Sequence, residues 1–123
     1  MPPRRRWRRF EMSTAQLYHV VVYRLADGLN PEKCAQMEAL FARCRDEIPE
    51  ILDIEFGHNV SVSRFARGWE YGAVMTMAGP AERDRFLTHP THLQLSAAAA
   101  DGFYREVVVF DLPIAGTDAG ETA

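Results

Sequence analysis

The sequence predicts an α+β domain in the order β-α-β-β-α-α-β around one four-stranded antiparallel sheet. Three observations lead to this fold class. The chain has 123 residues, 47% of them apolar, which suits a single domain with one core. Four short segments are rich in β-branched and aromatic residues, and an apolar run with helical spacing lies between the first two. Glycine or proline marks most of the boundaries between these segments.

The first strand is predicted over residues 17–25, and its alternate side chains point to opposite sides of the sheet. Both sides are largely apolar, so each needs a cover. A helix then begins after Asn30, the predicted N-cap, with Pro31 in its first turn, and it ends before Pro49. Its apolar stripe, spaced by three and four residues, consists of Cys34, Met37, Phe41, Cys44 and Ile48.

The remaining elements are shorter. The predicted bounds are 51–60 and 69–78 for the second and third strands, 80–88 and 92–101 for two short helices, and 103–112 for the fourth strand. In the second strand, Leu52, Ile54 and Phe56 share one face. Phe86 and Leu87 of the first short helix are expected to point inward.

This order is that of a ferredoxin-like fold whose second helix is broken in two. The helices of such a fold cover one face of the sheet. The other face, which carries Val20 and Val22, is apolar and predicts a partner sheet. Because a symmetric dimer is the commonest solution, we expect a homodimer that forms through this sheet face.

The charges are unevenly distributed. Five of the 14 basic residues lie in the first nine positions, so residues 12–123 carry 9 basic and 16 acidic side chains, a net charge of −7. The basic segment can be interpreted as a tether to nucleic acid or to a membrane surface. We favour a disordered Arg-rich extension over residues 1–12, because an acidic domain would repel phosphates. A domain over 13–112 and a loose tail over 113–123 complete the predicted organisation.

Neither a secretory signal nor a run of about 18 apolar residues is present, which predicts a cytoplasmic protein without a membrane span. Cys34 and Cys44 lie ten residues apart on the predicted helix, about 15 Å between their Cα atoms, so they cannot form a disulfide there. His89 and His92 have no clear carboxylate or thiolate partner and Pro90 separates them. We therefore expect no metal and no cofactor.

Four segments resemble the stress-responsive A/B barrel (Dabb) family of the dimeric α+β barrel group, over roughly residues 17–112. They are His19–Val22, Gly57–Ser61, Phe86–His92 and Val107–Asp111. The resemblance implies a ferredoxin-like subunit whose sheets pack back to back in a homodimer. It fixes no activity, because many members have none assigned.

One branch of the family, the plant polyketide cyclases that form olivetolic acid, suggests a site by resemblance. Its general base matches His92, its pocket histidine on the first strand matches His19, and another pocket histidine matches Tyr71. The tyrosine that assists the base is replaced here by Phe86, which has no hydroxyl group. The resemblance to this branch is therefore partial.

The residues themselves favour a similar site. His92 lies in the first turn of a predicted helix, where the positive helix terminus keeps the imidazole neutral, as a general base requires. Asp111 is expected to accept the other N–H of His92 and to orient the ring. Alternatively, His92 hydrogen-bonds a carbonyl of the last strand and has only a structural role. The residues expected to contact a ligand are Val21, Tyr23, Phe41, Phe86, His89 and Tyr104.

We therefore expect a homodimer of the stress-response type that binds a small apolar or aromatic molecule, with the acidic domain arguing against a nucleic-acid partner. The alternative is a cyclase- or lyase-like enzyme acting on a polyketide-like or phenolic substrate. In that enzyme His92 is the base, and His19 with Tyr71 or Tyr104 positions the substrate. An open cavity beside His92 is the feature that separates these functions from a purely structural role.

Overall fold

The computed structural model describes residues 16–114. The predicted Arg-rich extension at 1–12 and most of the predicted tail, from residue 115 onward, lie outside this range. The first two tail residues are described: Pro113 belongs to the last strand, and the amide of Ile114 donates to the carbonyl of Gln16 at 3.0 Å. None of the described helices is long and apolar enough to cross a membrane.

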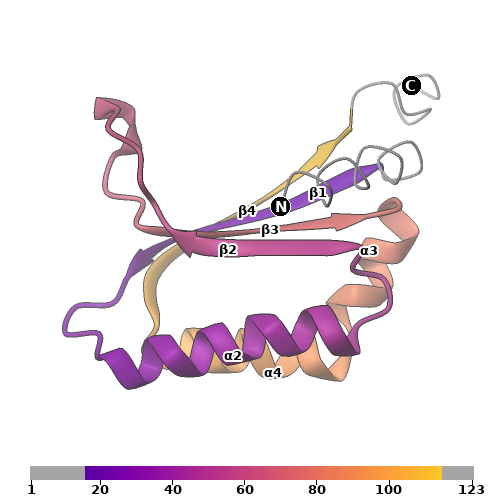
Figure 1. Ribbon diagram of the computed structural model, residues 1–123, viewed down its shortest axis with the longest axis horizontal. Coiled ribbons are helices and arrows are strands. Elements are labelled where there is room, and N and C mark those ends of the chain that lie inside the picture. Colours follow the sequence, from indigo (N-terminus) through magenta and orange to yellow (C-terminus); the bar gives the residue numbers. More distant parts are fainter. Residues whose placement is uncertain (1–15, 115–123) are drawn as a thin grey trace, which may run out of the picture.

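Four antiparallel strands form one sheet in the order β2-β3-β1-β4. Their bounds are β1 Leu17–Leu25, β2 Asp53–His58, β3 Tyr71–Met77 and β4 Tyr104–Pro113. The helices are α2 Pro31–Glu47, α3 Pro80–Leu87 and α4 Pro90–Ala100, and a short 3-10 turn, η1, covers Arg64–Ala66. All three α-helices lie on the same face of the sheet (Figure 1). The predicted ferredoxin-like order and the four-stranded antiparallel sheet are confirmed.

Helix α2 begins as the sequence predicts. The side chain of Asn30 accepts a hydrogen bond from the amide of Lys33 at 2.8 Å, and Pro31 occupies the first turn. Met37, Phe41 and Cys44 of the predicted stripe are fully buried. Cys34, one turn before Met37, is only half-buried, so the stripe does not reach the N-terminal turn of the helix.

Three predicted details are wrong. Helix α4 begins at Pro90, two residues earlier than predicted, because the ring of His89 accepts from the amide of Thr91 at 3.1 Å and serves as the N-cap. Leu87 is 38% exposed and so is not buried in the core, whereas Phe86 is fully buried as expected. Leu52 precedes β2 and is exposed, so it does not share the buried face of Ile54.

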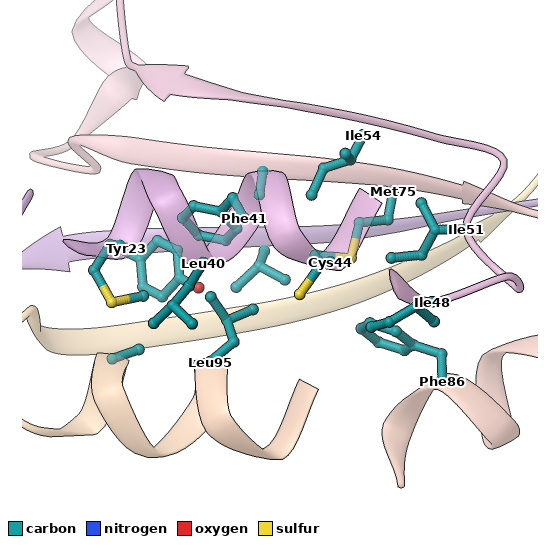
Figure 2. Close-up of a cluster of buried hydrophobic side chains, with 14 of the residues drawn as sticks. Tyr23, Leu40, Phe41, Cys44, Ile48, Ile51, Ile54, Met75, Phe86 and Leu95 are labelled. Atoms are coloured by element: carbon teal, nitrogen blue, oxygen red, sulfur yellow. The ribbon is translucent and has the colours of Figure 1, made fainter. Parts of the chain in front are cut away.

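The hydrophobic core lies between the sheet and the helices. Side chains from α2, α3, α4 and the strands meet in this layer, as Figure 2 shows. Phe41 stacks on Phe56 and Tyr71, with ring centroids 5.1 and 6.2 Å away, which anchors α2 over β2 and β3. Burial raises the pKa of the Cys44 thiol to about 11, in keeping with a structural role in this core.

The second face of the sheet, called here the open face, is apolar across three adjacent strands. Its members share one side of the pleat, and they are Val20, Val22, Val74, Val108, Phe110 and Leu112. The β1 members are half-buried, whereas Phe110 and Leu112 are 59% and 47% exposed. No α-helix packs on this face (Figure 1).

Candidate functional site

A cavity of about 200 Å³ lies between the helix-facing side of the sheet and helices α3 and α4. Six of the predicted site residues line it: His19, Val21, Tyr23, Phe86, His92 and Tyr104. The other lining residues are Ser96 and six with apolar side chains: Met75, Leu87, Leu95, Ala99, Val107 and Val109. An apolar cavity with a few polar groups suits a small, mostly apolar ligand.

His19 is almost completely buried on the helix-facing side of β1, with 3% of its surface exposed. The strand register places it directly opposite Asp111 of β4, and its Nδ1 lies 2.6 Å from Oδ1 of Asp111. The second carboxylate oxygen, Oδ2, accepts from Nη1 of Arg83 on α3, also at 2.6 Å. These contacts join β1, β4 and α3 through one chain of polar side chains, His19–Asp111–Arg83.

The charge state of Asp111 sets the tautomer of His19. Burial raises the pKa of Asp111, but the hydrogen bonds from Arg83 and His19 outweigh burial and leave the pKa below its usual 3.8. An ionised carboxylate can only accept, so the hydrogen of a neutral His19 sits on Nδ1 and donates to Asp111. The lone pair of His19 is therefore on Nε2.

His92 is the third residue of α4, and its Nδ1 lies 3.0 Å from the carbonyl oxygen of Leu87. Since a carbonyl only accepts, Nδ1 carries the hydrogen here too and leaves a lone pair on Nε2. Burial lowers the pKa of His92; the bond to Leu87 opposes the shift, and His19 and His89 add to it. His92 is therefore neutral at neutral pH.

Phe86 brings the two imidazoles together. The ring of His19 meets it edge-on at 5.1 Å between centroids, and the ring of His92 packs against it at 4.2 Å. Phe86 itself is fully buried. The cavity therefore presents two imidazoles, each with Nδ1 engaged and each in contact with the same aromatic ring.

The predicted pairing of Asp111 with His92 is wrong. Asp111 bonds His19, because the antiparallel register of β1 and β4 aligns these two residues and α4 turns His92 toward the end of α3. The alternative, a bond from His92 to a carbonyl of the last strand, is also wrong, since the carbonyl belongs to Leu87.

Four predicted site residues do not line the cavity: Asp111, whose contacts are given above, and Phe41, Tyr71 and His89. Phe41 and Tyr71 belong to the aromatic core under β2 and β3, where the Tyr71 hydroxyl lies 3.5 Å from Glu38 and burial raises its pKa to about 12. His89 is the N-cap of α4. Tyr104, half-buried at the start of β4, does line the cavity.

Some lining and supporting residues were missed from the sequence. Arg83 lies one turn before Phe86 on α3, and this i, i+3 spacing places the two on neighbouring positions of one helix face. Ala99 and Ser96 of α4 line the cavity with small side chains. In the sequence, only the alanine-rich segment at 97–100 indicated that α4 leaves room for a cavity beside it. Within residues 16–114 no three His, Cys, Asp or Glu side chains are grouped so as to hold a metal ion.

Comparison with known families gives one match. Residues 17–114 match the Stress responsive A/B Barrel Domain, called Dabb. The chain matches none of the curated proteins with which it was compared.

Three solved structures with the same fold each share 20% identity or less with this chain. A hydroxynitrile lyase from Passiflora edulis has a TM-score of 0.74 at 20% identity, over 85% of this chain and 97% of the lyase. A dimeric ferredoxin-like protein of unknown function from Thermobifida fusca has 0.70 at 19%, over 81% and 92%. A Dabb family protein from Mesorhizobium loti has 0.68 at 17%, over 83% and 99%. At these identities the likeness establishes the fold alone.

Proposed function

The chain belongs to the stress responsive A/B barrel domain family, and on that premise we propose that it is a homodimer that binds a small apolar or aromatic molecule. The observation that carries the proposal is the cavity of about 200 Å³ with mostly apolar walls and two imidazoles. Apolar walls exclude water from the ligand, and the imidazole lone pairs accept hydrogen bonds from it. A small phenol combines the two required features, a flat apolar body and a hydroxyl donor.

The dimer is supported by the open face. Three adjacent strands expose valine, leucine and phenylalanine there, and soluble monomers rarely leave such a patch uncovered. The Thermobifida fusca neighbour is described as dimeric with the same fold. We place the interface on the open face, which leaves the cavity on the opposite side of the sheet free for a ligand.

Binding is tested by titrating the protein with 4-ethylphenol and following backbone amides by NMR. We expect shifts at residues around the cavity, centred on His92 and Leu95. Ala99→Val fills the cavity and should weaken binding at least tenfold, a free-energy difference of about 1.4 kcal/mol. Ala98→Val is the matched control, because Ala98 directly precedes Ala99 on the same helix and does not line the cavity. Equal affinities for the two variants would refute this binding site.

A second candidate function is an enzyme of the cyclase or lyase type that acts on a polyketide-like or phenolic substrate. It is favoured by the Nδ1 contacts of His19 and His92, which leave a basic Nε2 on each imidazole of the cavity. The name of the Passiflora edulis neighbour, a hydroxynitrile lyase, lends it limited support. The likeness to the olivetolic acid cyclases belongs to this candidate too, although Phe86 occupies the position of their assisting tyrosine.

The enzyme candidate is tested with a poly-β-ketone analogue as substrate. Wild-type protein should consume the analogue faster than buffer, and His19→Gln combined with His92→Gln should reduce the rate to that of buffer. The double variant removes both possible bases, so its result does not depend on which one acts. A double variant as active as wild type would exclude this mechanism.

We also propose that residues 13–112 form the functional unit and that the protein acts in the cytoplasm. The family match over 17–114 supports the first part. Deletion of residues 1–12 should leave the unfolding temperature and 4-ethylphenol binding unchanged, and cell fractionation tests the location. A deletion variant that no longer binds the phenol would assign residues 1–12 to the functional unit.

A further inference from the structure

We infer that His19, positioned by Asp111 and Arg83, is the base that takes a proton from an enolisable ketone in the cavity, while His92 binds the ligand's hydroxyl group. The inference rests on the enzyme candidate of the proposed function. It reverses the roles expected from the sequence, where His92 was the base and His19 a positioning residue.

The contacts of His19 support this assignment. A proton accepted at Nε2 makes the ring positive, and the Asp111 carboxylate 2.6 Å from Nδ1 stabilises that charge directly. Because His19 is only 3% exposed, water would hydrate the positive charge of its protonated ring poorly. The Asp111 carboxylate therefore has to stabilise that charge. Asp111 therefore has two effects on His19. It stabilises the imidazolium that forms when Nε2 accepts a proton, and before that step it holds the neutral ring in the tautomer with a lone pair on Nε2.

Arg83 supports Asp111 in turn. Its guanidinium donates to Oδ2 of Asp111 at 2.6 Å, which leaves Oδ1 aligned with His19. A second contact, from Nε to Asp84 at 2.8 Å, fixes the orientation of the guanidinium on α3. Arg83 and Asp111 do not line the cavity, so we assign both as positioning residues.

His92 lacks a comparable partner. Its Nδ1 contacts only the uncharged carbonyl of Leu87, at 3.0 Å, and no described carboxylate is bonded to its ring. A backbone carbonyl stabilises an imidazolium less than an ionised carboxylate does. His92 is therefore suited to accept a hydrogen bond at Nε2 from a ligand hydroxyl and to remain neutral.

The proposed step is a balanced proton transfer. The C–H bond next to the ketone carbonyl breaks and its proton moves to Nε2 of His19. The electron pair of that bond forms a C=C bond, and the carbonyl π electrons move to oxygen to give an enolate. In D₂O the imidazolium exchanges its proton for a deuteron and returns the deuteron to the same carbon. The net change is one hydrogen replaced by one deuterium, with no redox partner.

The experiment measures this exchange by ¹H NMR with two ketones. The first is 4-(4-hydroxyphenyl)butan-2-one, which has a phenol hydroxyl, and the second is 4-phenylbutan-2-one, which lacks it. Wild-type protein should accelerate exchange of both, with a lower KM for the phenol. His19→Gln should lower kcat for both ketones about 100-fold or to the buffer rate. His92→Gln should keep kcat within about threefold and raise the KM of the phenol to that of the other ketone.

The positioning residues have a separate readout. Asp111→Asn should lower kcat about tenfold or more. It should also change the ¹⁵N chemical shifts of the His19 ring, which report the tautomer of that ring, while the ¹⁵N shifts of the His92 ring stay unchanged. His58→Gln is the matched control, because His58 is an exposed histidine outside the cavity. If His19→Gln does not fold, Asp111→Asn still decides the question, since it retains both imidazoles.

Two results would overturn the inference. Loss of exchange in His92→Gln with full exchange in His19→Gln would make His92 the base. Absence of exchange by wild-type protein that is saturated with the phenol, as judged by amide shifts around the cavity, would exclude proton abstraction and leave the binding function in place. If neither ketone nor 4-ethylphenol binds the cavity, the proposed function fails as well.

Discussion

At the scale of single residues, buried polar groups define the candidate site. An imidazole that is 3% exposed must have hydrogen-bond partners, because an unsatisfied buried polar group costs about 1–3 kcal/mol. Asp111 supplies that partner for His19, and Arg83 supplies a counter-charge for Asp111. The same contacts decide which ring nitrogen keeps its lone pair. The hydrogen bond to Asp111 thus both satisfies the buried imidazole of His19 and leaves its Nε2 free to accept a proton.

His92 gives the residue-scale prediction. Because its pKa in the folded protein lies below its usual 6.5, the unfolded chain binds a proton at this position before the folded protein does. The free energy of unfolding should therefore fall as the pH drops through about 6.5, and His92 should contribute no pH dependence above about pH 7.5. His92→Gln should lose less stability than wild type between pH 6.5 and 5.

Urea unfolding at pH 7.5, 6.5 and 5 checks this prediction, at one protein concentration throughout so that any dimerisation does not differ between samples. His58→Gln serves as the control histidine. Asp111 acts in the same direction at lower pH: its lowered pKa stabilises the fold above 3.8, and this contribution is lost as the pH falls further. Identical pH profiles for wild type and His92→Gln would contradict the prediction for His92.

At the scale of elements, helix α2 depends on its ends as well as on its buried stripe. Asn30 satisfies the amide of Lys33, one of the amides that the first turn leaves without a helical partner. At the other end, the amide of Ile48 donates to the carbonyl of Cys44 at 3.0 Å before Pro49 ends the helix. Between them Phe41 stacks on the sheet, so the helix is held at both ends and in the middle.

Asn30→Ala tests the N-cap. It should lower the free energy of unfolding by about 1 kcal/mol, because the amide of Lys33 loses its side-chain acceptor. Gln36→Ala, at an exposed position within the same helix, should change it by less than about 0.5 kcal/mol. Denaturant unfolding of the two variants gives the comparison, and equal stabilities would show that the cap contributes nothing measurable.

At the scale of the whole molecule, the two faces of the sheet have different roles. The helix-facing side carries the core and the cavity, whereas the open face carries Val20, Val22, Val74, Val108, Phe110 and Leu112. Strand β4 takes part in both, since Val107, Val109 and Asp111 point toward the helices and their neighbours point away. A dimer through the open face would therefore hold β4 in place from behind the cavity.

Phe110→Lys tests that dimer. Phe110 is 59% exposed in the single chain, so lysine should not disturb the subunit, but a charge in a back-to-back interface should weaken association at least tenfold. Leu93→Lys is the matched control, because Leu93 is 54% exposed on α4, on the helix side of the sheet. Light scattering at low micromolar concentration should give twice the chain mass for wild type and control, and a smaller mass for Phe110→Lys. A monomeric wild type would refute the dimer.

The order of the elements, the N-cap at Asn30 and the apolar character of both strand faces were predictable from the sequence. Each depends on periodicity or on contacts within one turn, which neighbouring residues determine. The predicted start of α4 was two residues too late, because the N-cap of this helix is a histidine, which is uncommon in that position. The exposure of Leu87 was missed because a short helix offers too few turns to define its buried face.

The partner of Asp111 was decided only by the tertiary structure. Asp111 and His19 lie 92 positions apart, and no local pattern distinguishes His19 from His92 as its neighbour. The register of β1 against β4 brings them together, and that register is set by side-chain packing across the whole sheet. The sequence alone determined which residue types were available for a site. The pairing of strands distant along the chain determined which imidazole the carboxylate reaches, and hence which one we infer to be the base.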